Sequence, residues 1–199
     1  GKVGPGVHRL IELTPGAGNR STPVWAIVPL KTLEAAKQRL ASLLTAAERR
    51  DLMLAMARDV LAALCQSKLL TGILIVSRTP EADALAQSFS TERFAESPDA
   101  DLPAALTQAS THLMEHLDAR GVMVIPADVP LISATEVDQI LTAHEQSPDV
   151  RGAVTVVPDG DHLCTNCLIL SPPDVIGFIF DGKSFKPHVD AAFRHGLTP

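Results

Sequence analysis

Three cationic side chains follow the first short apolar run of the chain. That run ends at Val28, and Lys31, Lys37 and Arg39 come soon after it. Such cations bind phosphate groups, because Lys supplies a concentrated positive charge and the planar fork of Arg contacts two oxygens at once. Their spacing alone leaves a solvent-exposed helix face open as the alternative. The sequence contains no glycine-rich phosphate loop of the P-loop or G-x-G-x-x-G type.

A carboxylate follows a later apolar run in the same way. The run from Val122 to Ile125 continues into Pro126-Ala127-Asp128-Val129-Pro130-Leu131. Magnesium commonly takes one or two carboxylates together with phosphate oxygens and water. An aspartate that stabilises a turn between two prolines is the alternative. Asp128 is therefore a candidate magnesium ligand.

The segment 158–167 is dense in polar groups and contains a CxxC pair, Cys164 and Cys167. A redox CxxC places its first thiol at the start of a helix, whereas this pair enters an apolar run. A structural zinc site would need a second pair of ligands. Neither reading of the pair is favoured.

Two further patterns have structural alternatives. His112 and His116 match the H-x-x-E-H pattern of some zinc peptidases, but no third ligand is evident. Ser184 precedes a helical pattern, where it could hold an anion with nearby backbone N–H groups. From the residues alone, an ordinary helix N-cap is favoured for Ser184.

The composition limits the classes of partner. Lys and Arg number 17 against 23 Asp and Glu, which gives a formal charge of −6. This balance argues against nucleic acid as a partner, and an anionic ligand would need a local cluster of cations. No apolar run approaches the roughly 18 residues of a membrane span. Three cysteines cannot all pair within one chain, so we expect a cytoplasmic protein without a disulfide framework.

Short apolar runs alternate with helical patterns from Val24 onward. Each run is rich in Val and Ile and reads as a buried strand; the runs are 24–28, 73–76, 122–125, 153–157 and 168–170. Capping-box pairs open two of the expected helices, Thr45 with Glu48 and Ser133 with Glu136. A third helix spans 102–117. In the first helix, we expect Leu52, Met56, Val60 and Leu64 to form the apolar stripe, with Met53 and Leu61 beside them.

This alternation predicts a three-layer α/β/α domain with a mainly parallel sheet. We expect a single domain over residues 23–199, preceded by a flexible extension over residues 1–22. Ligands of open α/β sheets bind beyond the carboxyl ends of the strands, so the residues that follow each strand are the candidates for function.

Taken in order, these segments resemble the guanylyltransferases that activate 2-phospho-L-lactate, phosphoenolpyruvate or 3-phospho-D-glycerate in the biosynthesis of the deazaflavin coenzyme F-420. The resemblance extends from Val24 to about Leu197. It is carried by the following blocks: Val28-Pro29-Leu30-Lys31 with Ala36-Lys37-Gln38-Arg39-Leu40, Ile75-Val76-Ser77-Arg78, Asp128-Val129-Pro130-Leu131, Thr165-Asn166, and Ser184-Phe185 with His188. It implies a fold like that of the nucleotide-diphospho-sugar transferases.

The resemblance also implies roles. Lys31, Lys37 and Arg39 would bind the phosphates of GTP, and Asp128 would hold Mg²⁺. The pocket for the acid would be lined by four residues, Cys164, Thr165, Asn166 and Ser184. A phosphate oxygen of the acid would attack the α-phosphorus of GTP and release pyrophosphate, so that catalysis would consist mostly of positioning and charge neutralisation.

The sequence departs from the family pattern at three places. Relatives usually carry a Gly-Thr-Gly-Thr-Asn-like run where this chain has His162-Leu163-Cys164-Thr165-Asn166. This change leaves the identity of the acceptor acid open and slightly favours 3-phosphoglycerate. A Leu-Asn-x-Ala-Leu segment is replaced by Leu102-Pro103-Ala104-Ala105-Leu106, which removes a nucleotide contact. Relatives also continue into an Asp-rich tail with further metal ligands; within this sequence, Asp159 and Asp161 are the alternatives.

Two other functions stay open at this point. One is nucleotidyl transfer to another acceptor, such as a molybdopterin or a sugar phosphate. The other is non-catalytic nucleotide binding. The sequence does not address the oligomeric state, for which a homodimer is one alternative.

Overall fold

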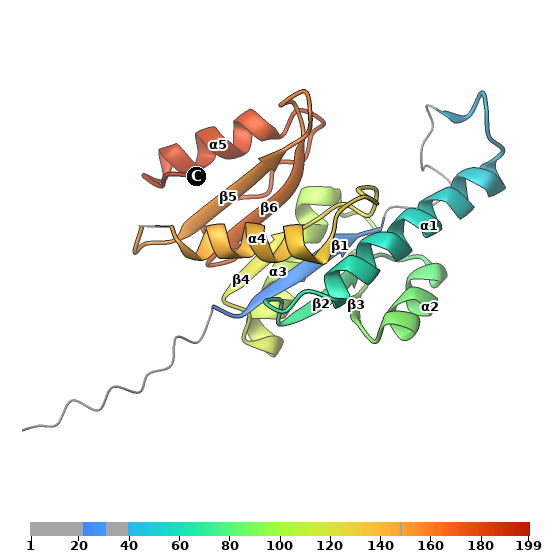
Figure 1. The fold of residues 1–199 in the computed structure, drawn as a ribbon, viewed down its shortest axis with the longest axis horizontal. Coiled ribbons are helices and arrows are strands. Elements are labelled where there is room, and N and C mark those ends of the chain that lie inside the picture. Colours follow the sequence, from blue (N-terminus) through green and yellow to red (C-terminus); the bar gives the residue numbers. More distant parts are fainter. Residues whose placement is uncertain (1–21, 31–39, 148) are drawn as a thin grey trace, which may run out of the picture.

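The described part of the chain forms one six-stranded sheet between two layers of helices (Figure 1). The computed structural model describes residues 22–30, 40–147 and 149–199, so the expected extension over residues 1–22 lies almost entirely outside the described residues. Strands and helices follow one another along the chain as β1 (Val24–Pro29), α1 (Ala46–Cys65), β2 (Gly72–Val76), α2 (Pro80–Phe89), β3 (Glu92–Phe94), α3 (Leu102–Leu117), β4 (Gly121–Val124), α4 (Ala134–Glu145), β5 (Ala153–Pro158), β6 (Thr165–Ser171) and α5 (Phe185–Arg194).

The sheet is mostly parallel and has the strand order β3-β2-β1-β4-β6-β5. The pairs β2–β3, β1–β2 and β1–β4 are parallel, whereas β6 is antiparallel to both β4 and β5. Among the described strands, β6 alone therefore runs against the others. The predicted three-layer architecture with a mainly parallel sheet is confirmed.

Each central strand sends alternate side chains into two separate cores. In β1, Ala26 and Val28 belong to the core beneath α1, α2 and α4, whereas Ile27 belongs to the core beneath α3 and α5. In β4, Met123 and Val124 divide in the same way. Successive side chains of a strand point to opposite faces, so a sheet covered on both sides needs continuous apolar runs. This requirement explains why the runs of Val and Ile predicted the strands.

Both predicted capping boxes are present. The Thr45 hydroxyl accepts from the backbone N–H of Glu48 at 3.2 Å, and the Glu48 carboxylate accepts from the backbone N–H of Thr45 at 2.8 Å. Ser133 and Glu136 make the same pair of bonds at 3.2 and 2.8 Å. These bonds satisfy amide groups that a helix start otherwise leaves unpaired, and they fix where α1 and α4 begin.

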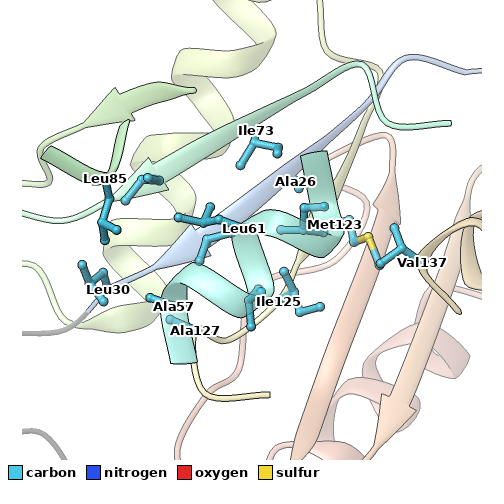
Figure 2. Packing of buried hydrophobic residues seen from close by; sticks show 14 of the residues in the cluster. Ala26, Leu30, Ala57, Leu61, Ile73, Leu85, Met123, Ile125, Ala127 and Val137 are labelled. Atoms are coloured by element: carbon cyan, nitrogen blue, oxygen red, sulfur yellow. The ribbon is translucent and has the colours of Figure 1, made fainter. Parts of the chain in front are cut away.

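Four of the six residues predicted for the apolar stripe of α1 are buried, namely Met53, Val60, Leu61 and Leu64, and two are not. Leu52 is exposed, and Met56 is only partly buried, whereas Met53, Ala57 and Leu61 are buried. A spacing of four residues drifts by about 40° per step around a helix with 3.6 residues per turn, so a strict four-residue series leaves the buried face at one end. Figure 2 shows Leu61 and Ala57 packed over the strands in the core on this side of the sheet.

The sequence did not predict α2 or β3. The strand β3 has only three residues, Glu92-Arg93-Phe94, and their charges hide the apolar pattern. The helix α2 begins with Pro80, a residue that tolerates the first turn because the missing N–H would be unpaired there.

No helix in the described parts of the chain is both long and apolar enough to cross a membrane.

We expect Leu61→Ala to lower the free energy of unfolding by about 2–5 kcal/mol, because it opens a cavity in the core. Leu61 is 1% exposed. Leu52→Ala on the same helix is the matched control; Leu52 is 37% exposed, and its replacement should cost less than about 1 kcal/mol. Urea denaturation of the two variants measures both values, and equal losses would show that Leu61 does not belong to a tightly packed core.

Candidate functional site

The strand order defines one edge of the sheet as the place for a ligand. From β1 the chain moves outward to β2 and β3, and it then returns to add β4 on the other side of β1. The carboxyl ends of β1 and β4 therefore flank a topological switch point, where open α/β sheets bind their ligands. Leu30, the residue after β1, is buried at this edge and donates its N–H to the carbonyl of Val76 at 2.9 Å.

The predicted cation cluster begins directly after Leu30. Lys31, Lys37 and Arg39 all lie outside the described residues, so the structure does not place their side chains. Their role as phosphate ligands stays a prediction. The structure describes the chain up to Leu30, the residue that follows β1.

Asp128 lies on the other side of the switch point. The backbone N–H of Ile125 donates to the carbonyl of Ile27 at 3.0 Å, which extends the pairing of β4 with β1. Ala127 is then buried in the core, whereas Asp128 is exposed. Asp128 therefore lies exposed at this edge of the sheet, and its role as a metal ligand stays a prediction.

The reversed direction of β6 brings a further segment to the same edge. Because β6 is antiparallel to β4, its first residues, Thr165 and Asn166, lie beside the carboxyl end of β4. A pocket of about 410 Å³ joins the two segments; its walls include Asn166 together with Val129 and Leu131 from the loop after Asp128. The structure thus brings Asn166 close to the Asp128 loop, although almost 40 residues separate them in the sequence.

The turn that leads into β6 is organised by Asp159. Its carboxylate accepts from the backbone N–H groups of Leu163 at 2.8 Å and Cys164 at 3.0 Å. The hydrogen bond from Cys164, followed by that from Leu163, holds the pKa of Asp159 below its usual range. His162, in the same turn, has a φ of +56°, a left-handed conformation that favours glycine. This is the position at which the relatives named in the resemblance carry the first glycine of their run.

A buried polar network fixes the start of β6 from behind. The Ser184 hydroxyl accepts from the backbone N–H of Thr165 at 3.0 Å, and the Thr165 hydroxyl lies 3.0 Å from Nδ1 of His188. Nε2 of His188 accepts from the backbone N–H of Ile179 at 3.0 Å. Since Nε2 is an acceptor, the neutral ring carries its proton on Nδ1 and donates it to Thr165.

Two of the predicted pocket residues belong to this buried network. Thr165 and Ser184 are only 4% and 3% exposed, and their polar groups already bond to one another and to His188. Cys164 is half-buried, and its thiol donates to the carbonyl of Gly182 at 3.1 Å. Asn166 lines the pocket. Ser184 precedes α5 as predicted, but its hydroxyl makes no cap bond to that helix.

The CxxC pair and the H-x-x-E-H pattern do not form a redox or metal site among the described residues. The Cys164 and Cys167 thiols are unpaired with one another, and burial raises the pKa of Cys167 to about 12, which disfavours a reactive thiolate. The rings of His112 and His116 stack with their centroids 4.7 Å apart. Among the described residues, no group of three or more potential metal ligands of the His, Cys, Asp or Glu type comes together.

Sequence reasoning missed the role of His188. It also missed a charged pair at the carboxyl ends of β2 and β3. Arg78 follows β2, and its Nε lies 3.2 Å from the Glu96 carboxylate, which follows β3. No local pattern identifies this pair, because it depends on the pairing of β2 with a strand of only three residues. The identity of His188 was visible in the sequence, but its two partners come from distant segments.

We expect the protein to lose stability as the pH falls from 6.5 to 5. Burial lowers the pKa of His188 and of His144 to about 4, below the value of about 6.5 of the unfolded chain. The unfolded chain therefore takes up protons first as the pH falls, and stability that is fully present above pH 6.5 is lost towards pH 4. Urea titrations at pH 7, 6 and 5 should show a loss on the order of 1–2 kcal/mol per histidine at pH 5.

Carboxylates contribute little in this window, because their ordinary pKa values lie near 4. His188→Gln should therefore reduce the dependence of the unfolding free energy on pH between 6.5 and 5. An unchanged dependence in that variant would show that His188 takes up its proton at the same pH in the folded and unfolded chains.

Comparison with known proteins identifies relatives over nearly the whole described chain. The family described as "Guanylyl transferase CofC like" matches residues 24–199. A phosphoenolpyruvate guanylyltransferase of Roseiflexus castenholzii is 40% identical over 177 residues, which cover 88% of this chain and 77% of that protein. One of Rubrobacter xylanophilus is 35% identical and covers 87% and 82% of the two chains. A 2-phospho-L-lactate guanylyltransferase of Methanobrevibacter ruminantium is 31% identical, covering 88% and 75%.

Solved structures confirm the predicted fold. A putative nucleotide-diphospho-sugar transferase of Desulfovibrio desulfuricans superposes with a TM-score of 0.70 at 16% identity, over 89% of this chain and 78% of that one. CMP:2-keto-3-deoxy-manno-octonic acid synthetase superposes with a TM-score of 0.55 at 10% identity, over 88% and 87%. At these identities the likeness concerns the fold alone. The family match and the relatives at 31–40% identity go further: this chain belongs to the CofC-like guanylyltransferases and is an enzyme of that family.

Proposed function

We propose that this enzyme transfers the GMP moiety of GTP to phosphoenolpyruvate and releases pyrophosphate, in the biosynthesis of coenzyme F-420. Family membership supports guanylyl transfer. The structural observation that carries the assignment of the site is the contact between two segments at the switch point. The loop after Asp128 and the start of β6 at Asn166 line one pocket, on the side of β4 that faces away from β1.

The relatives favour phosphoenolpyruvate as the acid. Those that are 40% and 35% identical are named phosphoenolpyruvate guanylyltransferases, whereas the 2-phospho-L-lactate guanylyltransferase is 31% identical. These identities outweigh the slight preference for 3-phosphoglycerate that the altered run at His162–Asn166 suggested. The three acids share a phosphate and a carboxylate, and they differ in the three-carbon skeleton that carries these two groups.

Mg²⁺ is the proposed metal, with Asp128 as its ligand. The exposed carboxylate of Asp128 lies at the edge where the phosphates would bind, and Mg²⁺ needs only one or two carboxylates when phosphates and water complete its shell. Asp159 organises the turn before β6, where one of its oxygens accepts from two backbone amides. Asp161 is exposed beside it and is the alternative ligand. When bound, the metal would neutralise charge on the phosphates.

The residues of the chain would position the two substrates. Lys31, Lys37 and Arg39 would bind the phosphates of GTP. Asn166 would hydrogen-bond the acid, while Thr165 and Ser184 would hold the start of β6 in place through the network with His188. Of the four predicted acid-binding residues, Asn166 would then contact the acid and Thr165 and Ser184 would position it, while the Cys164 thiol donates to the carbonyl of Gly182.

The proposed reaction needs no general base. A phosphate monoester is largely doubly ionised near pH 7, so its oxygen is already a nucleophile. That oxygen forms a bond to the α-phosphorus of GTP, and the bond from the α-phosphorus to the bridging oxygen breaks. Pyrophosphate leaves with the electron pair of that bond. Alignment of the two phosphates and neutralisation of their charges are then the main sources of rate.

The cytoplasm, where GTP is available, is the proposed location. A homodimer is the proposed assembly.

We expect pyrophosphate release when the enzyme is incubated with GTP, Mg²⁺ and phosphoenolpyruvate, with a higher kcat/KM than for 2-phospho-L-lactate or 3-phosphoglycerate. A coupled pyrophosphate assay with each acid at equal concentration measures this order. A higher kcat/KM for another acid would correct the acceptor. Binding of GTP without pyrophosphate release from any acid would leave only a non-catalytic nucleotide-binding function.

We expect Asp128→Asn to reduce kcat by at least about 100-fold, because the neutral amide binds Mg²⁺ weakly. Asp174→Asn is the matched control, since Asp174 is also exposed but follows β6 at the opposite edge of the sheet. Both variants should unfold at the wild-type urea concentration. Full activity of Asp128→Asn at limiting Mg²⁺ would remove this carboxylate from the metal site.

A further inference from the structure

The two flanks of the switch point differ in chemistry. The flank over β4 and β6 holds Asp128 and Asn166, which the proposed function gives to the metal and the acid. The flank over β2 and β3 has no assigned role. Adjacent strands lie about 4.8 Å apart, so β3 is roughly 10 Å from β1, a span that a nucleoside can cover when its phosphates bind beyond β1.

The first carboxylate after β3 lies at the end of this flank. Glu96 comes two residues after Phe94, the last residue of β3, and β3 is parallel to β2 and β1. Its side chain is 15% exposed, so it lies in the surface of the loop at the edge where ligands of this fold bind.

The loop that carries Glu96 is held in place from two sides. The Arg78 guanidinium donates to the carbonyl of Pro98, and its Nε lies 3.2 Å from Oε1 of Glu96. The backbone N–H of Ser97 donates to the side-chain carbonyl of Gln108 in α3 at 2.9 Å. Recognition of a flat ring requires such anchoring, because a contact group must be held within a fraction of an ångström.

The second carboxylate oxygen of Glu96, Oε2, has no hydrogen-bond donor among the described residues. The same oxygen is buried. Leaving a buried acceptor unsatisfied is costly, and a charged one more so, so this oxygen needs a donor that the described residues do not supply. The partner must present N–H groups to a carboxylate.

We propose that Glu96 recognises the guanine base of GTP, with Arg78 as the residue that orients its carboxylate. Guanine presents two donors side by side, N1–H and the N2 amino group, which match the two oxygens of a carboxylate. Adenine presents an acceptor at N1, which a carboxylate repels. The inference rests on the proposed function, because it assigns the base of the proposed nucleotide to this flank.

Inosine triphosphate (ITP), which lacks only the N2 amino group, is the probe. Pyrophosphate release with Mg²⁺ and phosphoenolpyruvate is measured for GTP, ITP and ATP. We expect the wild-type enzyme to prefer GTP over ITP by about tenfold or more in kcat/KM, and to use ATP least.

Glu96→Gln replaces one acceptor oxygen with a donor that opposes the donors of guanine. It should lower kcat/KM for GTP by roughly 10- to 100-fold and bring the ratio between GTP and ITP close to one. Glu92→Gln is the matched control, because Glu92 is an exposed glutamate on β3 itself, and it should keep the wild-type ratio. An unchanged ratio in Glu96→Gln overturns the inference, since a purely structural role would lower both activities alike.

Two measurements keep the test decisive. If circular dichroism shows that Glu96→Gln does not fold, Glu96→Asp takes its place: it retains the charge opposite Arg78 and should still lower the ratio of kcat/KM between GTP and ITP. Equal use of GTP and ITP by the wild type also overturns the inference. If the wild type releases no pyrophosphate with any acid, titration calorimetry with GTP and ITP separates the two proposals. Preference for GTP that is lost in Glu96→Gln would then support base recognition while the proposed reaction fails.

Discussion

Burial of the sheet on both faces is the constraint from which the arrangement of this enzyme follows. Two apolar cores, one beneath α1, α2 and α4 and the other beneath α3 and α5, take up the side chains of every central strand. Figure 2 shows part of the first core. A polar group on those faces would lose its water without gaining a partner. Polar chemistry is therefore confined to the strand ends, and the strand order makes the edge at β1 and β4 the place where it gathers.

The antiparallel direction of β6 adds a second source of residues to that edge. A parallel strand in this position would bring its carboxyl end, near Ser171, to the ligand, but β6 brings Thr165 and Asn166 instead. Asp159 organises the turn that makes this reversal, and the Ser184–Thr165–His188 network holds its end against α5. Because the network is buried and satisfied, it can fix Asn166 while making no contact with a substrate itself.

Charge is distributed over the same edge in a way that suits a nucleotide and an acid. The protein is acidic overall, with a formal charge of −6, so cations near the phosphates must act locally. Asp128 and Glu96 lie on opposite flanks of the switch point, one past β4 and the other past β3. In the proposed function, one flank would hold the metal and the acid, and in the further inference the other would hold a base that donates hydrogen bonds.

The sequence by itself determined the layers, the main strands and two helix starts, because continuous apolar runs and capping boxes are local properties that burial and unpaired amides impose on neighbouring residues. It also indicated Asp128, because a residue that follows a strand can be recognised once the strand is predicted, whereas Asn166 was indicated through the family resemblance. Only the tertiary structure decided the direction of β6, the three-residue strand β3, the shift of the buried face on α1 and the partners of His188 and Glu96. Each of these depends on pairing between segments far apart in the chain, where a short or charged stretch gains its conformation from its neighbour rather than from its own composition.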